Sequence, residues 1–319
     1  MASNLLAAPL LFFALGVLSR VVRSDLGIPP ALVRALSLYL LAGIGLHGGA
    51  ELARSGLGTV IAPAAAALAL AFATPLVAYA LLRRALRLDG FNAAAIAAHY
   101  GSVSIATFLA AAAYLQARGH DYEAAAVVML ALMEAPAILV GLALAVRLRA
   151  RQSEAPRLGS VLGQTVTHGS VVLLFGTIAI GAFATPGSLE TVEPFFKTMF
   201  MGALCLFLVQ MGVDAAAKLR EARAAAVPLV AFGLAMPLAM GAVGVAVGHY
   251  LLGFSVGGTT LVATLAASAS YIAVPPAMRL GVPEANPSLY LLLALGVTFP
   301  FNLLVGVPLF HWAAGMLAA

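Results

Sequence analysis

The chain has 319 residues, of which 63% are hydrophobic and 9% are charged, and its mean hydropathy is +1.04. Soluble globular domains carry about 25% charged residues, so this composition excludes a soluble domain. Several separate apolar runs of about 20 residues predict an all-α polytopic membrane protein, and the short alternating segments of a membrane β-barrel are not evident.

Ten transmembrane helices are expected along the chain from the apolar runs and the residues that interrupt them. No positive segment precedes the first run, and Arg20 and Arg23 follow it, which is the reverse of a cleaved signal peptide. A polar linker at 151–163 separates five spans within 1–150 from five within 164–319. The expected spans are 4–22, 28–50, 59–82, 92–117, 122–148, 164–185, 194–214, 225–252, 255–279 and 287–313.

The basic residues predict the orientation of the spans. If the spans alternate in direction, 13 of the 17 lysines and arginines fall on one side and 3 on the other, while Arg34 lies within the second span. Cytoplasmic loops are enriched in lysine and arginine, so we expect both termini outside and the linker in the cytoplasm. Orientation in a lipid bilayer accounts for the net charge of +5, and no nucleic-acid partner is expected.

Three pairs of segments repeat between the two halves of the chain. A Ser-x-Ser motif occurs in spans four and nine, a proline lies in an apolar stretch of spans five and ten, and an acid ends spans two and seven. Because each half has an odd number of spans, the repeats would be inverted, as in many secondary transporters. The paired segments are YGSVSIAT (100–107) with ASASYIAV (267–274), EAPAILVG (134–141) with FPFNLLVG (299–306), and GIGLHGGAEL (43–52) with QMGVDAAAKL (210–219).

Polar residues interrupt spans four and nine, where leucines would be expected. Irregular backbone in lipid is tolerated only beside protein or a water-filled cavity, and the N-terminus of a half-helix suits an anion. The alternative is that the serines bond their own helix or allow close packing. Two matching motifs favour the substrate site, in which Tyr271 is either a site residue or a packing residue. The candidate hydroxyls are Ser102, Ser104, Thr107, Ser268 and Ser270.

A carboxylate in the middle of span five is the other candidate. Glu134 is expensive in lipid unless it is paired or protonated, which suggests a cation ligand or proton carrier, with a helix-packing acid as the alternative. Asn302 lies in the matching region of the second half and keeps an oxygen without the charge. His99 is expected to titrate or to bond between helices. Glu51 and Asp214 are expected at hydrated span ends.

Sequence patterns of enzymes are not evident. There is no metal-ligand spacing, glycine-rich phosphate loop or nucleophile elbow, and the single cysteine, Cys205, excludes a disulfide framework. We therefore expect no enzymatic activity and no cofactor. A channel is disfavoured because channel pores are usually built from symmetric subunits and filter loops.

The segment GFSVGGTTLVATLAASASYIAVPPAMRLGVPEANPSLY (253–290) resembles the matching block of the SbtA-type sodium-dependent bicarbonate transporters of bacteria. That block also contains GFS-x-GG, a serine-rich stretch, a double proline and G-[IV]-P-x-ANPS-x-Y. In the first half, 43–52 and 100–125 agree as well, followed by MEAPAILV. The resemblance extends along nearly the whole chain, and the ANPS segment with its upstream serines is its most specific part.

The resemblance implies a ten-span inverted-repeat fold like that of the bile-acid sodium symporters, with broken, crossing helices in spans four and nine. A core domain would hold spans three to five and eight to ten, and a gate domain spans one, two, six and seven. It also implies an elevator-like mechanism, a homotrimer in the bacterial inner membrane, and a PII-like cytoplasmic regulator.

The implied function is symport of bicarbonate and Na⁺. The anion would meet Gly101–Thr107 and Ser268–Ser270, and the Na⁺ ion would bind at Glu134, near Ser104 and Asn302. The chain departs from the cyanobacterial members at Tyr271, where an aspartate follows their serines. Two alternatives therefore stay open, namely proton-coupled or facilitated transport of another small carboxylate or anion, and a non-transporting membrane sensor.

Overall fold

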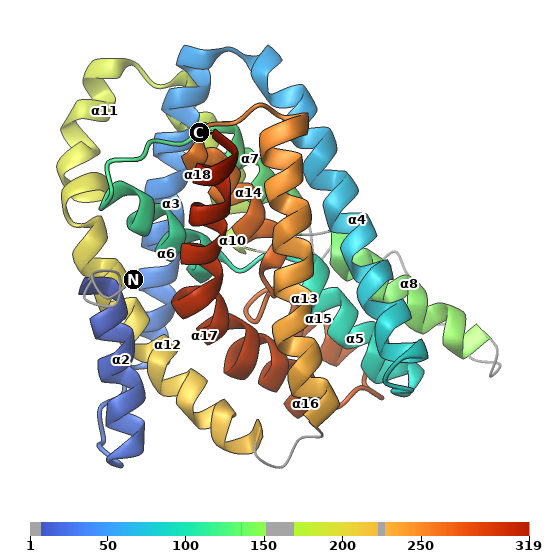
Figure 1. The fold of residues 1–319 in the computed structure, drawn as a ribbon. Coiled ribbons are helices and arrows are strands. Elements are labelled where there is room, and N and C mark those ends of the chain that lie inside the picture. The colour runs from blue at the N-terminus through green and yellow to red at the C-terminus, as the bar shows by residue number, and fades with distance from the viewer. Residues whose placement is uncertain (1–7, 135, 151–168, 223–226, 319) are drawn as a thin grey trace.

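The computed structural model describes residues 8–134, 136–150, 169–222 and 227–318, and all regular elements in these ranges are helices (Figure 1). Seven helical runs are long and apolar enough to cross a membrane, so the expected polytopic helical membrane protein is confirmed. The expected linker at 151–163 lies outside the described residues. The seven runs are Pro30–Arg54, Gly58–Arg84, Gly90–Gln116, Ala125–Arg149, Gly187–Lys218, Val227–Leu251 and Pro287–Ala318.

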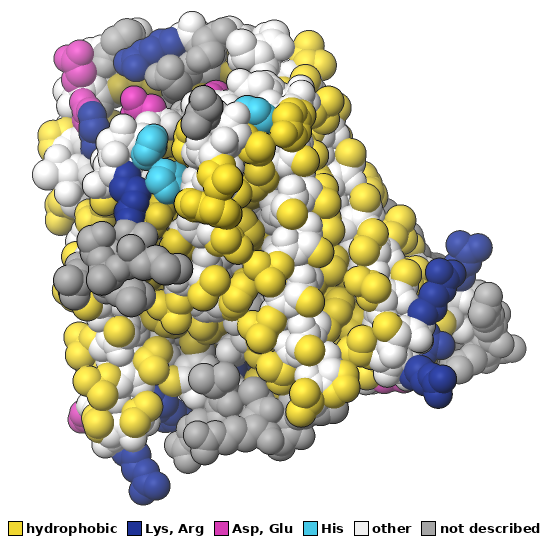
Figure 2. Space-filling view, viewed as in Figure 1, with side chains coloured by type: hydrophobic (Ala, Val, Ile, Leu, Met, Phe, Trp, Pro, Cys, Tyr) yellow, Lys and Arg dark blue, Asp and Glu magenta, His cyan; other side chains and the backbone are white. Residues whose placement is uncertain are grey.

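The surface and the interior differ as expected for a protein in lipid. Hydrophobic side chains cover most of the middle of the face shown in Figure 2, and lysines and arginines lie near its edges. In its most apolar window Gly90–Gln116 is 94% buried, against 39% for Gly58–Arg84. The expected fourth span therefore lies at the centre of the molecule, surrounded by the other helices.

Helices occupy all five expected spans of the first half. Span four consists of two helices, α5 and α6, and span five of two more, α7 and α8. The elements are α2 (Ala8–Val21), α3 (Pro30–Ser55), η1 (Leu57–Val60), α4 (Ile61–Arg84), α5 (Gly90–Gly101), α6 (Ile105–Gln116), α7 (Ala125–Met133) and α8 (Pro136–Ala150).

The second half has more interruptions. Span nine is again split into two helices, and several short π-helical turns, labelled η2 to η5, interrupt the others. The elements are α10 (Gly169–Phe183), α11 (Pro186–Glu193), η2 (Pro194–Thr198), α12 (Phe200–Ala222), α13 (Val227–Ala246), η3 (Val247–Leu251), α14 (Val256–Ala267), α15 (Val274–Gly281), α16 (Pro287–Leu291), η4 (Leu292–Thr298), α17 (Phe299–Phe301), η5 (Asn302–Gly306) and α18 (Val307–Ala318).

Several helix ends lie beyond the expected span limits, among them those of α3 and α12. Helix α3 continues to Ser55 because Gly56, at φ 88°, is where the backbone leaves the right-handed helical region. Helix α12 continues to Ala222, beyond the expected end of span seven at residue 214. Asp214 lies inside α12, where its Oδ1 accepts a hydrogen bond from Gln210 Nε2 at 2.8 Å.

Two long helix pairs are in backbone contact through glycines. Helix α2 packs along α12, and α3 packs along α10. A Cβ at Gly16 of α2 would lie 1.9 Å from a backbone oxygen of α12, and one at Gly212 of α12 would lie 2.2 Å from a backbone oxygen of α2. The other pair has the same arrangement, with 2.0 Å for Gly49 of α3 and 2.2 Å for Gly181 of α10. Larger side chains at these positions would force the helices apart.

Candidate functional site

The first break separates α5 from α6. Ser102 and Ser104 have extended backbone, and Ser104 is the N-cap of α6. The Ser104 hydroxyl oxygen accepts hydrogen bonds from Thr107 N at 3.2 Å and from Thr107 Oγ1 at 2.9 Å. Gly101 permits the close approach of α4, because a Cβ there would lie 2.4 Å from Pro75 Cδ. The break is thus fixed by a cap on one side and a close helix contact on the other.

The second break separates α14 from α15. Helix α14 ends at Ala267, Ser268 is extended, and the chain bends through Tyr271–Ala273 before α15 begins. Ser268 Oγ donates a hydrogen bond to Leu265 O at 3.0 Å. The double proline occupies the first turn of α15, where proline is tolerated because the missing N–H would have had no helical partner. The prolines therefore start a helix after the break.

The two breaks are hydrogen-bonded to each other in the interior. Ser104 N donates to Ser268 Oγ at 3.0 Å, and Ser270 N donates to His99 O at 2.8 Å. The segments 102–104 and 268–270 therefore lie side by side, although about 160 residues separate them in sequence. The structure brings the two Ser-x-Ser motifs together, as the sequence predicted.

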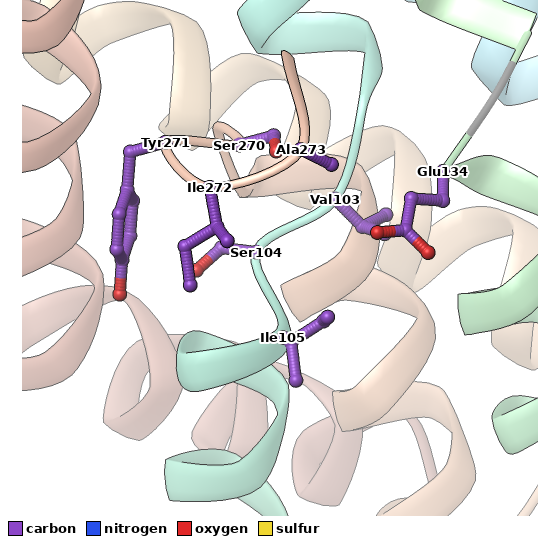
Figure 3. Close-up of a pocket in the computed structure, with 8 residues that line it drawn as sticks. All are labelled: Val103, Ser104, Ile105, Glu134, Ser270, Tyr271, Ile272 and Ala273. Carbon is purple, nitrogen blue, oxygen red and sulfur yellow. The ribbon is translucent and has the colours of Figure 1, made fainter. Parts of the chain in front are cut away.

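A small buried cavity lies beside the two breaks. Its volume is ≈ 10 Å³, which is about the space that one water molecule occupies. In Figure 3, Glu134 and Tyr271 lie on opposite sides of the segment that carries Val103 and Ser104. The lining residues are Val103, Ser104, Ile105, Glu134, Ser270, Tyr271, Ile272 and Ala273.

Glu134 supplies the carboxylate of the cavity. It follows the last residue of α7, and Pro136, which has no N–H to continue the helix, begins α8. The side chain is 2% exposed, and Oε1 has no hydrogen-bond partner among the described residues. Among the residues that the structure describes, no lysine, arginine or histidine lines the cavity. A buried carboxylate oxygen of this kind is stabilised by a cation, a proton or an ordered water.

Of the predicted site residues, Ser104, Glu134, Ser270 and Tyr271 line the cavity, whereas Gly101, Ser102, Thr107, Ser268 and Asn302 do not. Ser102 Oγ donates to the backbone oxygen of Glu134 at 2.9 Å, which joins the first break to the end of α7. Tyr271 turns its hydroxyl to Met211 Sδ of α12 at 3.4 Å, so it contacts both the cavity and a neighbouring long helix. Asn302 is fully buried and does not line the cavity.

The hydrogen bond of His99 and the isoleucines of the cavity lining were not predicted from the sequence. His99 Nδ1 bonds to Ala95 O of its own helix at 2.7 Å, and its ring stacks on Tyr290 at 4.4 Å between centroids. It therefore does not make the expected side-chain bond between helices. Ile105 and Ile272 line the cavity, and the only sequence signal for them is their position next to the serines.

These features define the class of protein, namely a polytopic helical membrane protein with two interrupted helical segments and, beside them, a small cavity that contains one carboxylate. The chain belongs to the Na⁺-dependent bicarbonate transporter superfamily, whose match covers residues 8–315. The family resemblance found in the sequence is therefore confirmed along nearly the whole chain. No curated protein matches the chain. Membership of a transporter family points away from an enzyme.

Proposed function

We propose that the chain is a secondary transporter that imports bicarbonate, or a similarly small anion, together with Na⁺. The observation that carries this proposal is the meeting of two interrupted spans at a small cavity that also contains a carboxylate with one unpartnered oxygen, Oε1 of Glu134. Family membership supports both the substrate and the coupling ion.

The anion would bind at the N-terminus of α6. The first N–H groups of an α-helix have no partner within it, and the helix dipole adds about half a positive charge at that end. Ser104 uses its hydroxyl oxygen for Thr107, so Ile105 and Ala106 would present their N–H groups to the ligand. Ser270 lines the same cavity and adds a hydroxyl donor. This arrangement suits a small, hydrogen-bond-accepting anion.

The cation would bind at Glu134, close to Ser104, with nearby backbone carbonyls completing its oxygen ligands. A bare carboxylate in the cavity would repel an anion, whereas a carboxylate with a bound cation would attract it. Binding of one ion would therefore favour binding of the other, and by thermodynamic linkage the effect is reciprocal. This reciprocity is the physical basis of symport.

Helix packing supports two inverted repeats, 1–150 and 164–319. Under such a repeat α2 corresponds to α10 and α3 to α12, so the glycine-mediated pairs α2 with α12 and α3 with α10 become equivalent. The contact of α4 with α5 likewise corresponds to that of α13 with α14. We assign the gate domain to α2, α3, α10 and α12 and the core domain to α4–α8 and α13–α18 (Figure 1). The core would move relative to the gate in an elevator-like manner.

Uptake of labelled bicarbonate into proteoliposomes tests the proposal. We expect uptake with an inward Na⁺ gradient and little uptake when K⁺ replaces Na⁺. Liposomes without protein are the control. Absence of uptake with either cation would overturn bicarbonate transport and favour another small anion or a membrane sensor.

Proton coupling is the second candidate, and the hydrogen bonding of the cavity favours it. Ser104 Oγ already accepts two hydrogen bonds, and the Tyr271 hydroxyl is directed to Met211, so few side-chain oxygens are left for a Na⁺ ion. Glu134 would then carry a proton. Uptake that persists in K⁺ and follows an inward proton gradient would identify this mechanism.

The proposal extends to assembly and location. A homotrimer in a bacterial inner membrane, with both termini outside, would match the family and the distribution of basic residues. A PII-like protein would bind from the cytoplasm. Cross-linking in membranes tests the trimer, and co-purification with and without nucleotide tests the regulator.

A further inference from the structure

Asn302 makes one side-chain hydrogen bond, and it is to the start of the second break. Its Nδ2 donates to Ala267 O at 2.8 Å, and Ala267 is the last residue of α14. A helix leaves its last carbonyls without intrahelical donors, because the residues that would supply the N–H groups lie beyond its end. Asn302, which is 0% exposed, supplies a donor to one of these carbonyls.

The orientation of the Asn302 amide is fixed by this contact. If the amide were flipped, Oδ1 would face Ala267 O, and two acceptors would be in contact. Oδ1 has no hydrogen-bond partner among the described residues, and it lies against Gly306, where a Cβ would come within 2.6 Å of it. Since Asn302 does not line the cavity either, its geometry is that of a hydrogen-bond donor to the break.

The first break is also joined to the span that follows it by a hydrogen bond, but here the break supplies the donor and the following span the acceptor. There Ser102 Oγ of the break donates to the backbone oxygen of Glu134. In the second half, the side chain comes from the following span and the carbonyl from the break. Both breaks are therefore anchored to the next helical segment by one buried side-chain hydrogen bond.

We propose that Asn302 is a positioning residue for the anion site and is not a ligand of the coupling cation. By donating to the Ala267 carbonyl, Asn302 fixes the position of the next residue, Ser268. Ser268 Oγ in turn accepts the hydrogen bond from Ser104 N. The proposal rests on the proposed function, because the segment that Asn302 positions is the expected anion site. It replaces the expectation that Asn302 is a cation ligand.

Two substitutions of Asn302 separate the two roles. Asn302→Leu removes the donor and leaves the Ala267 carbonyl unsatisfied. Asn302→Asp opposes that carbonyl with a carboxylate when ionised, but donates an O–H to it when protonated. A positioning role therefore predicts that the Asp variant is defective at alkaline pH and recovers at acidic pH. A cation ligand predicts the reverse, because an ionised aspartate would bind the cation more tightly.

Few native titratable groups lie near residue 302, where their own titration would add to this pH dependence. The elements packed against η5 are α6, α13, α14, α17 and α18, and their titratable residues are Tyr114 and His311. These two contact each other, with the Tyr114 hydroxyl 3.5 Å from His311 Nδ1. The Leu variant keeps both residues and has no titratable group at 302, so it measures their contribution.

The first measurement does not depend on transport. A cysteine is placed in the cavity by Ser270→Cys in a Cys205→Ala background, and its rate of maleimide labelling is measured in membranes. At each pH, the rate in an Asn302 variant is divided by the rate in the same background with the native Asn302. We expect a several-fold change in the ratio for Asn302→Leu at every pH. For Asn302→Asp we expect a similar change at alkaline pH that returns towards one as the pH falls. Thr264→Val is the matched control, because it removes a buried hydroxyl of α14 that bonds only to Thr260 O within the helix.

The second measurement is uptake by the same variants with Ser270 and Cys205 restored. We expect the anion KM to rise about tenfold in Asn302→Leu, with an unchanged half-saturating cation concentration at saturating anion. Unchanged labelling in both variants would overturn the positioning role, as would tighter cation dependence in Asn302→Asp. If the parent shows no uptake, the proposed function fails, and the labelling ratios alone decide whether Asn302 positions the break.

Discussion

At the scale of single residues, the cavity depends on Glu134. Its oxygens are the only carboxylate oxygens among the described cavity-lining residues, and Oε1 has no protein partner. Because the side chain is shielded from water, its charge state and the ion bound to it are coupled. Under the proposed function, this residue would therefore decide whether a cation is needed for anion binding.

Glu134→Gln is expected to abolish the cation dependence of uptake while the protein remains folded. The amide keeps the size of the side chain but has no charge, and it does not need a cation to be stable when buried. The measurement is uptake against Na⁺ concentration, with size-exclusion chromatography to check the fold. Glu123→Gln is the matched control, because Glu123 bonds to Ser255 at the start of α14, away from the cavity. An unchanged Na⁺ response in Glu134→Gln would remove Glu134 from the mechanism.

Ser104→Ala and Ser270→Ala are expected to raise the anion KM for different reasons. Ser104→Ala also removes the N-cap of α6, which typically stabilises a helix by about 1 kcal/mol, so its thermal stability should fall. Ser270 has no side-chain hydrogen bond to the described residues, so its substitution should change KM with little change in stability. Uptake kinetics and thermal unfolding in detergent measure the two effects. Parental KM values in both variants would favour a packing role for the serines.

The sequence predicted the serines and Glu134 as neighbours, but not what each hydroxyl does. Polar residues in the middle of apolar spans are visible in the sequence because they are expensive in lipid. Their hydrogen-bond partners are not visible, since Ser104 and Ser268 meet only when spans four and nine cross. For the same reason Asn302 looked like a second oxygen ligand, although its amide hydrogen is the group in use.

At the scale of helices, the glycines determine how closely the long pairs pack. Gly49 was part of the motif that suggested the end of a helix, yet α3 continues past it to Ser55. A glycine that ends a helix and a glycine that permits close packing look alike in a sequence. The structure distinguishes them, because Gly56 has a positive φ and nothing within 4 Å, whereas Gly49 faces the backbone of α10.

Gly212→Val is expected to destabilise the protein by about 1–3 kcal/mol or more, because its side chain would overlap the backbone of α2. Gly202→Val is the matched control on the same helix, since a Cβ at Gly202 meets nothing within 4 Å. Thermal unfolding of both variants in the same detergent measures the difference. Equal melting temperatures would mean that α2 and α12 do not pack through Gly212.

Glu284, in the connection between α15 and α16, forms an ion pair with Arg149 of α8, and the stabilisation from this pair depends on pH. Glu284 accepts hydrogen bonds from Arg149, with 2.7 Å between Nε and Oε1, and this lowers the pKa of the Glu284 carboxyl below its usual 4.5. Its folded pKa lies below the unfolded one, so the stabilisation is present above the unfolded value and is lost as the pH falls through the folded value.

We expect Glu284→Gln to reduce stability by about 1 kcal/mol or less at neutral pH, because the carboxylate is 38% exposed and the pair is screened. The difference from the parent should shrink as the pH falls below the unfolded pKa of 4.5 and vanish once the pH is below the lowered folded pKa. Thermal unfolding across this pH range measures it. A difference that persists at the lowest pH would show that the pair does not titrate as described.

At the scale of the whole molecule, the sequence predicted a helical membrane protein and the approximate position of most of the helical regions described, but it missed α11, which lies in the expected gap between spans six and seven. Hydropathy is sufficient for this, because each span must satisfy its own backbone in lipid. It could not predict the reciprocal contacts of α2 with α12 and of α3 with α10, which join opposite halves of the chain. Contacts of this kind depend on the order of helices in space, and the apolar periodicity of one span contains no information about its neighbour.

The bond between the two breaks has a consequence for biosynthesis. Ser104 N finds its acceptor in Ser268, which is synthesised 164 residues later. While the chain is made, span four therefore enters the membrane with a backbone donor that lacks its final partner, and this donor must be hydrated or held by the insertion machinery until span nine arrives. A chain truncated before span nine would leave this donor in the first break without its final partner.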